Sequence, residues 1–107
     1  MIQEPQELME IIKTEPAVLI YFSHAACNVC KVLKPKIKSL LEEDFDQIKM
    51  VYVDTVLHPE IPAQMSIFTV PTIVVFLEGK VYFKWSRNIS IQQIKRELGR
   101  PYQMLFS

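Results

Sequence analysis

The feature that most constrains the fold is an uninterrupted run of β-prone apolar residues, Ala17–Phe22, which begins directly after Pro16. A strand with one face in water alternates polar and apolar residues, whereas a continuous apolar run is typical of a strand buried on both faces. Burying both faces of a sheet requires layers of helix on either side of it. The run therefore predicts an α/β fold.

The rest of the chain alternates predicted helices and strands. Apolar residues at helical spacing predict a helix before the run, over Pro5–Thr14, and a second helix after it, whose apolar face is Val32, Leu33, Ile37, Leu40 and Leu41. The predicted elements are helices over Pro5–Thr14, Cys30–Glu43, His58–Ser66 and Ile91–Leu98, and strands over Ala17–Phe22, Ile48–Val53, Thr72–Leu77 and Val81–Trp85. The last two strands form a hairpin through Glu78-Gly79-Lys80, which makes the predicted sheet mixed. Ser90 is expected to cap the final helix and Gly99 to end it.

Length and charge limit the possible functions. The chain has 107 residues, half of them apolar, so we expect residues 1–107 to form one domain with its own core. Twelve basic and twelve acidic residues leave no net charge, which argues against a nucleic-acid or membrane-surface partner. Residues 1–13 lack the apolar run of a secretory signal, and no segment approaches the ~20 apolar residues of a membrane span. We therefore expect a cytoplasmic protein in a reducing compartment.

The only two cysteines, Cys27 and Cys30, lie where the apolar run gives way to the second predicted helix. A sulfur at the start of a helix lies beside unpaired backbone N–H groups and the positive end of the helix dipole, which favour a thiolate. Thiolates carry out thiol–disulfide exchange, and a second cysteine one turn further on can close a disulfide and release a bound partner. In a reducing compartment such a pair is more often catalytic or metal-binding than structural.

Two other interpretations of the pair are open. It can be an inert buried dithiol, or His24, Cys27 and Cys30 can bind a metal, because imidazole and thiolate are good zinc ligands. The second set supplies three protein ligands, with His58 the sole remaining histidine. We expect no metal site.

The chain resembles the thioredoxin family across nearly its whole length. The resemblance rests on the joint spacing of Cys27-x-x-Cys30-Lys31, Pro35, Val70-Pro71-Thr72 and the hairpin Glu78-Gly79-Lys80. It implies a thioredoxin fold, with a central mixed sheet and helices on both faces. It also implies that Cys27 is the nucleophile and Cys30 the resolving cysteine of a protein-disulfide reductase.

The resemblance further implies how such a reductase meets its partners. Pro71 is expected in the cis form, with Val70, Pro71 and Ala26 contacting the substrate. The expected partners are disulfide-containing proteins and an electron donor of the thioredoxin-reductase type. No cofactor is implied beyond the redox-active disulfide.

Several residues depart from the thioredoxin pattern. Asn28 and Val29 replace Gly-Pro between the cysteines, and Ala26 and Ser23 replace aromatic residues before them, so the docking surface should be less aromatic. Tyr21 and Tyr52 stand where the family has a buried Asp and its Lys partner. Losing both charges together is physically sensible, because an isolated buried charge is costly. Deprotonation of Cys30 should then depend on solvent or on His24, and resolution should be slow.

These departures leave a second hypothesis, a thioredoxin-fold binding, adaptor or redox-sensing domain with weak or no turnover. The apolar C-terminal tail, residues 99–107, can dock on the core or pair with another subunit. The sequence does not fix the oligomeric state.

Overall fold

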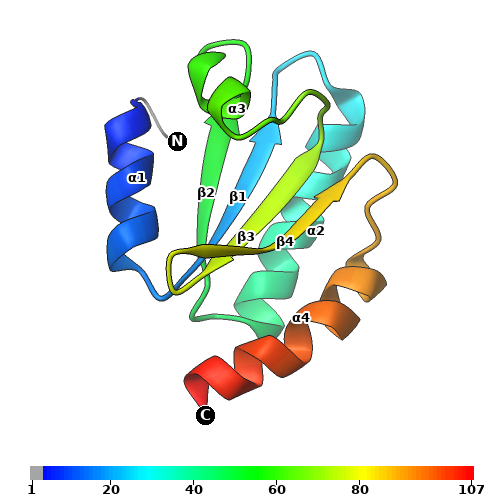
Figure 1. Cartoon of the computed structure of the whole chain (residues 1–107). Helices are drawn as coiled ribbons and strands as arrows, with labels where there is room; N and C mark the ends of the chain where they lie inside the picture. The colour runs from blue at the N-terminus through cyan, green and yellow to red at the C-terminus, as the bar shows by residue number, and fades with distance from the viewer. Residues whose placement is uncertain (1–3) are drawn as a thin grey trace.

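Figure 1 shows the computed structural model, which describes residues 4–107. Residues 1–3 lie outside this range; they belong to the predicted domain and to residues 1–13, the segment searched above for a secretory signal. The elements in chain order are α1 (Pro5–Thr14), β1 (Ala17–Ser23), α2 (Asn28–Asp44), β2 (Lys49–Asp54), α3 (Glu60–Gln64), β3 (Thr72–Leu77), β4 (Lys80–Ser86) and α4 (Ile91–Phe106).

The four strands of the described chain form one mixed sheet in the order β2-β1-β3-β4. β1 pairs with β2 in parallel and with β3 antiparallel, and β3 and β4 form the predicted hairpin. Every residue of β1 is buried, as its continuous apolar sequence requires. The predicted mixed α/β sheet is confirmed.

Alternate residues of β1 enter two different cores. Leu19 and Tyr21 point to the face covered by α2 and α4, whereas Ile20 and Phe22 point to the face covered by α1 and α3. The two cores lie on opposite faces of the sheet, with a helical layer over each (Figure 1). Within residues 4–107, no helix has the combination of length and apolarity needed to cross a membrane.

The prediction that Gly99 ends the last helix is wrong. α4 continues through Gly99 and Pro101 to Phe106. Glycine and proline both disfavour helix interiors, but packing of the last turns on the core outweighs that local preference. The apolar tail is therefore the end of a helix, and its side chains Tyr102, Leu105 and Phe106 pack against the core shared by α2 and α4.

Three smaller predictions also differ from the structure. Val32 is exposed rather than on the buried face of α2. α2 begins two residues earlier than predicted, because Cys27 itself caps it, and α3 is shorter than predicted. Pro59 precedes α3 as its cap, and residues Met65 and Ser66 after it leave the helical conformation.

Candidate active site

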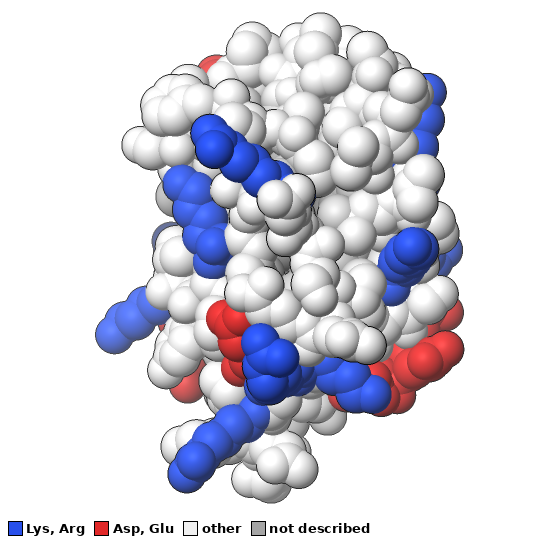
Figure 2. Space-filling model, turned by 90° about the vertical axis from the view of Figure 1, so that its right-hand side faces the viewer, with Lys and Arg blue, Asp and Glu red and all other residues white. Residues whose placement is uncertain are grey.

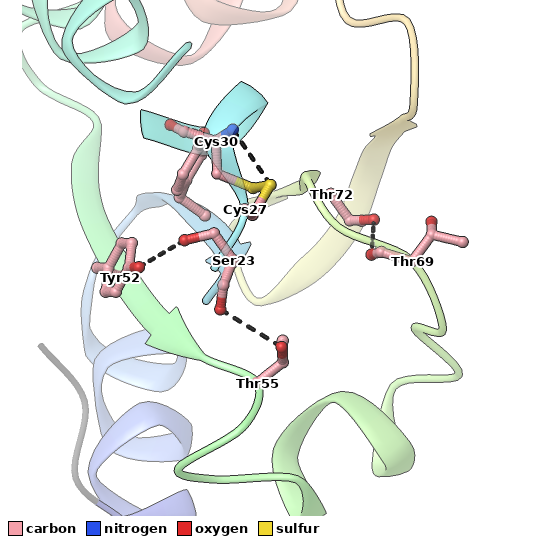
Figure 3. The surroundings of a disulfide bond; sticks show 8 residues. Ser23, Cys27, Cys30, Tyr52, Thr55, Thr69 and Thr72 are labelled. Carbon is pink, nitrogen blue, oxygen red and sulfur yellow. Dashed lines mark hydrogen bonds between the residues drawn. A yellow bond between two sulfur atoms is a disulfide. The ribbon is translucent and has the colours of Figure 1, made fainter. Parts of the chain in front are cut away.

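The two sulfur atoms at the start of α2 differ in their exposure to solvent. Cys27 is the N-cap of the helix. Its Sγ accepts a hydrogen bond from the backbone N–H of Cys30, and the N and Sγ atoms are 3.2 Å apart. The two cysteines form a disulfide with their Cα atoms 5.3 Å apart (Figure 3). Cys27 is partly exposed, whereas Cys30 is buried at 2% exposure. One sulfur therefore faces solvent and the other lies behind it.

The loop before β3 lies next to this pair. The Val70–Pro71 peptide bond is cis, as the resemblance implied. The Thr72 hydroxyl donates to the Thr69 carbonyl at 2.7 Å and closes the loop on itself, beside the disulfide in Figure 3. Val70 and Cys27 pack against the same core cluster. The predicted site residues Cys27, Cys30, Val70 and Pro71 are thus brought together.

Tyr21 lies directly beneath the first turn of α2. Its side chain is fully buried, and its hydroxyl donates a hydrogen bond of 2.7 Å to the backbone carbonyl of Cys30. Burial, and secondarily the neighbouring Tyr52, raises the pKa of Tyr21 to about 12. The phenol is therefore a neutral hydrogen-bond donor at physiological pH, and it holds the backbone of Cys30 in place.

Tyr52 connects this buried group to the surface. Its ring stacks on that of Tyr21, with centroids 6.0 Å apart, and its hydroxyl accepts a hydrogen bond from Ser23 (Figure 3). On the outer side, Lys34 Nζ lies 4.0 Å from the centre of the Tyr52 ring, a cation–π arrangement. Hydroxyl groups and an aromatic stack thus occupy the place of the family's charged pair.

Ser23 and Lys34 are the site residues that sequence reasoning missed. The sequence identifies Ser23 only as a substitute for an aromatic residue, and Lys34 belongs to none of the motifs found there. The period of a strand gives a usable signal, because Tyr21 and Ser23 are two positions apart and so share one face of β1. The strand register explains why Tyr52 is close to both, since Tyr21 of β1 is paired with Tyr52 of β2.

His24 is partly buried in the loop that precedes Cys27. It lines a hollow of about 320 Å³ with Thr55, Phe68 and Val70. Within the described residues its buried Nδ1 has no hydrogen-bond partner, so no bond from that atom reaches either cysteine. In residues 4–107 no group of three or more His, Cys, Asp and Glu side chains is placed to hold a metal ion.

Charge is sparse in the two segments that meet at the site, although the exposed Lys31 follows Cys27 by one helical turn. Residues 16–30 and 61–77 contain no Lys, Arg, Asp or Glu. Ala26, Asn28 and Val29 are exposed, and Phe68 is 85% exposed. Figure 2 shows charged side chains to be sparse at the upper end of the molecule, where this site lies, and to gather toward the lower half.

Comparison with known proteins agrees with this geometry. The thioredoxin family model matches residues 2–99. The chain belongs to the thioredoxin family. It is 28% identical over 93 residues to the thioredoxin-like protein YdfQ of Bacillus subtilis, covering 87% of this chain and 82% of the relative.

Other thioredoxins give the same result. Thioredoxin 1 of Chlorobaculum tepidum is 28% identical over 94 residues, covering 87% of this chain and 93% of the relative. Among solved structures, thioredoxin 1 from Thermosipho africanus superposes with a TM-score of 0.76 at 30% identity, covering 84% of this chain and 99% of that one. A mutant thioredoxin from Halobacterium salinarum has a TM-score of 0.82 at 22% identity, covering 94% and 87%, which supports the fold alone.

Family membership and the cysteine pair together define the chemistry. A thioredoxin with Cys27 and Cys30 at disulfide distance is a thiol–disulfide oxidoreductase. The pair alternates between dithiol and disulfide in this chemistry.

Proposed function

We propose that this thioredoxin reduces disulfides in other proteins, with Cys27 as the nucleophile and Cys30 as the resolving cysteine. The observation that carries the proposal is the position of Cys27 Sγ, which is partly exposed at the N-terminus of α2 and accepts the Cys30 backbone N–H. That position favours a thiolate, the form of sulfur that attacks a disulfide. Cys30 lies behind it and is shielded from substrate.

The reaction has two exchange steps. The Cys27 thiolate attacks one sulfur of the substrate disulfide, which forms a mixed disulfide and releases the first substrate thiolate, protonated by solvent. Cys30 then loses its proton and attacks Cys27 Sγ, which forms the Cys27–Cys30 disulfide and releases the second substrate thiolate. Two electrons pass from the protein dithiol to the substrate, and no cofactor takes part.

The loop before β3 supports docking of an extended substrate segment. Val70 is partly exposed beside Cys27, and the cis bond to Pro71 turns the chain at that point. We assign the exposed Ala26 and the partly exposed Val70 to substrate contact; Pro71, also expected to contact the substrate, is itself buried and fixes the turn that presents Val70. The exposed Asn28 and Val29 between the cysteines lie on the same surface.

Catalysis requires the dithiol to be regenerated. We propose an electron donor of the thioredoxin-reductase type in a reducing, cytoplasmic compartment. Such a compartment keeps the pair reduced between turnovers.

Single cysteine replacements test the assignment. In Cys27→Ser, insulin reduction with excess dithiothreitol should fall to the rate of dithiothreitol alone, because the remaining Cys30 is buried. Cys30→Ser should also lose turnover, and the reduced variant mixed with insulin in the absence of dithiothreitol should accumulate a covalent adduct, visible on a non-reducing gel and cleaved when dithiothreitol is added. Normal turnover by Cys27→Ser would falsify the roles assigned to the two cysteines.

Tyr21 favours a second candidate, a binding or redox-sensing domain with weak turnover. Tyr21 is a neutral phenol that donates to the Cys30 carbonyl, so it does not supply a base for the Cys30 thiol. This candidate predicts that the wild-type protein reduces insulin hardly faster than dithiothreitol alone. It also predicts that a double Cys27→Ser, Cys30→Ser variant still retains its partner.

A further inference from the structure

β2 forms an open edge of the sheet. It is the first strand in the order β2-β1-β3-β4, and within residues 4–107 its one hydrogen-bonded neighbour is β1. The outward N–H and C=O groups of an edge strand are free to pair with another extended chain, and proteins commonly cover such edges. This edge is therefore a place where a further strand can add.

A groove follows this edge. It has a volume of about 770 Å³, and its floor is five consecutive residues, from Ile48 to Tyr52. Ile11 of α1 lines one wall, and Lys38 and Leu41 of α2 line the other. α1 and α2 cover opposite faces of the sheet, and side chains of both helices line the groove.

We propose that this groove binds one extended polypeptide segment of a partner protein, which pairs with β2 as an additional strand. Adjacent strands lie about 4.8 Å apart, so the occupant must enter between the two helices. A single extended segment can do so. A second folded copy presenting its own β2 would bring its α1 and α2 against these helices, so a slender segment suits the groove better.

The lining indicates the chemistry of the segment. Side chains of an added strand would alternate between the two helical walls, where the apolar residues Ile11 and Leu41 lie. Along the α2 wall the charge is positive at Lys34 and Lys38 and becomes negative at Glu42 and, after the helix, at Asp46. The α1 wall adds the negative Glu7, and the floor adds the positive Lys49. Glu42 and Asp46 outnumber Lys49 at the Ile48 end, so the groove suits an alternately apolar segment with an acidic residue toward Tyr52 and a basic residue toward Ile48.

A synthetic peptide tests the proposal. The probe is a cysteine-free peptide of about eight residues, alternating Val and Thr, with Glu at one end and Lys at the other. It is titrated into the isotope-labelled double variant Cys27→Ser, Cys30→Ser, so that a failure of disulfide reduction cannot affect the result. We expect the backbone amide signals of residues 49–53 to shift and their hydrogen exchange to slow.

A matched pair of charge reversals locates the site. Lys38→Glu should weaken binding about fivefold, the effect of roughly 1 kcal/mol from one exposed charge pair. Lys36→Glu makes the same change on the same helix, but Lys36 faces the hollow between α2 and α4 and should leave binding unchanged.

Four outcomes would overturn the proposal. They are no binding, amide shifts confined to β4 or to the Cys27 loop, equal effects of the two charge reversals, and a dimer by light scattering that Lys38→Glu dissociates without peptide. The last would show that a second copy occupies the edge.

Discussion

At the scale of single residues, Tyr21 distinguishes this site from its family's pattern. Its hydroxyl restrains the backbone of Cys30 rather than serving as a proton acceptor for the sulfur. A phenol donating to a carbonyl is a neutral interaction, so it avoids the cost of desolvating a charge below the cysteines. The same property should govern both the titration of this residue and the rate at which Cys30 attacks.

Alkaline titration should reveal Tyr21 directly. Its pKa is raised from 10.0 to about 12, so the folded state holds this proton more tightly than the unfolded chain does. Its contribution to stability is complete below pH 10.0 and is lost as pH rises through about 12. Absorbance at 295 nm should show a late phenolate phase, and urea unfolding should show falling stability over that range.

Tyr21→Phe is the control for this titration. It should remove the late phase and reduce the dependence of stability on pH in that range. If the late phase persists in a folded Tyr21→Phe protein, it belongs to another tyrosine, and burial of Tyr21 is not its cause.

A carboxylate at position 21 should speed resolution of the mixed disulfide. Tyr21→Asp would supply a general base beneath Cys30, and such bases contribute about 100-fold or more when well placed. The measurement is release of thionitrobenzoate from a preformed adduct on Cys27 at neutral pH. Tyr21→Asn matches the size of Asp without its charge, so equal rates in the two folded variants would contradict the idea.

Sequence reasoning located most of this site but not its internal contacts. The spacing of Cys27, Cys30 and Pro71 and the family resemblance were enough to predict the pair and the cis bond, which local preferences alone would not favour. The bond from Tyr21 to the Cys30 carbonyl depends on how far α2 stands above β1, a distance that tertiary packing sets. Lys34 was missed for the same reason, since it lies on α2 and its partner Tyr52 lies on β2.

At the scale of elements, the last turns of α4 hold the end of α2 against the core. The Tyr102 hydroxyl accepts a hydrogen bond from the backbone N–H of Gln47 at 3.2 Å and donates one to Asp46 at 3.3 Å. Its ring packs edge-on against Phe45, with centroids 5.0 Å apart. The tail was expected either to dock on the core or to pair with another subunit. In this structure it docks on the core.

Replacing Tyr102 should therefore destabilise the whole protein. Tyr102→Ala removes the ring and both hydrogen bonds and should lower the free energy of unfolding by about 2–3 kcal/mol, somewhat less than a fully buried aromatic residue would. Tyr102→Phe keeps the ring and should cost about 1 kcal/mol. Urea unfolding followed by circular dichroism gives both values.

Met104 provides the comparison on the same helix. It is 74% exposed, so Met104→Ala should change stability by less than about 0.5 kcal/mol. Equal losses in the Tyr102 and Met104 variants would mean that helix formation, rather than docking, is what the tail contributes.

At the scale of the whole molecule, stability should be concentrated in the centre of the sheet. β1 and β3 are buried along their full lengths and paired on both sides, whereas β2 and β4 each have one free edge within the described chain. Native-state hydrogen exchange should be slowest in β1 and β3 and faster on the outer sides of β2 and β4. Uniform protection across all four strands would contradict this gradient.

The overall architecture could be predicted because the strands and the helices differ in how their apolar residues are spaced. Continuous apolar runs in β1 and β3, helical spacing in α1 and α2, and the turn at Gly79 were enough to predict a covered mixed sheet. The extent of α4 was not predictable from local rules, because Gly99 and Pro101 disfavour a helix that long-range packing maintains. The groove beside β2 could not be foreseen either, since tertiary packing brings together the residues of α1, α2 and β2 that line it.

The scarcity of charge around Cys27 also bears on how partners arrive. Long-range attraction between opposite charges accelerates many protein encounters and fades as salt is added. Residues 16–30 and 61–77 offer no such charges, and Lys31 and Lys34 follow Cys27 by one and two helical turns, so capture of a substrate should rely mainly on random collision and then on short-range contact with exposed side chains such as Val29 and Phe68. The rate of capture should then vary little with ionic strength.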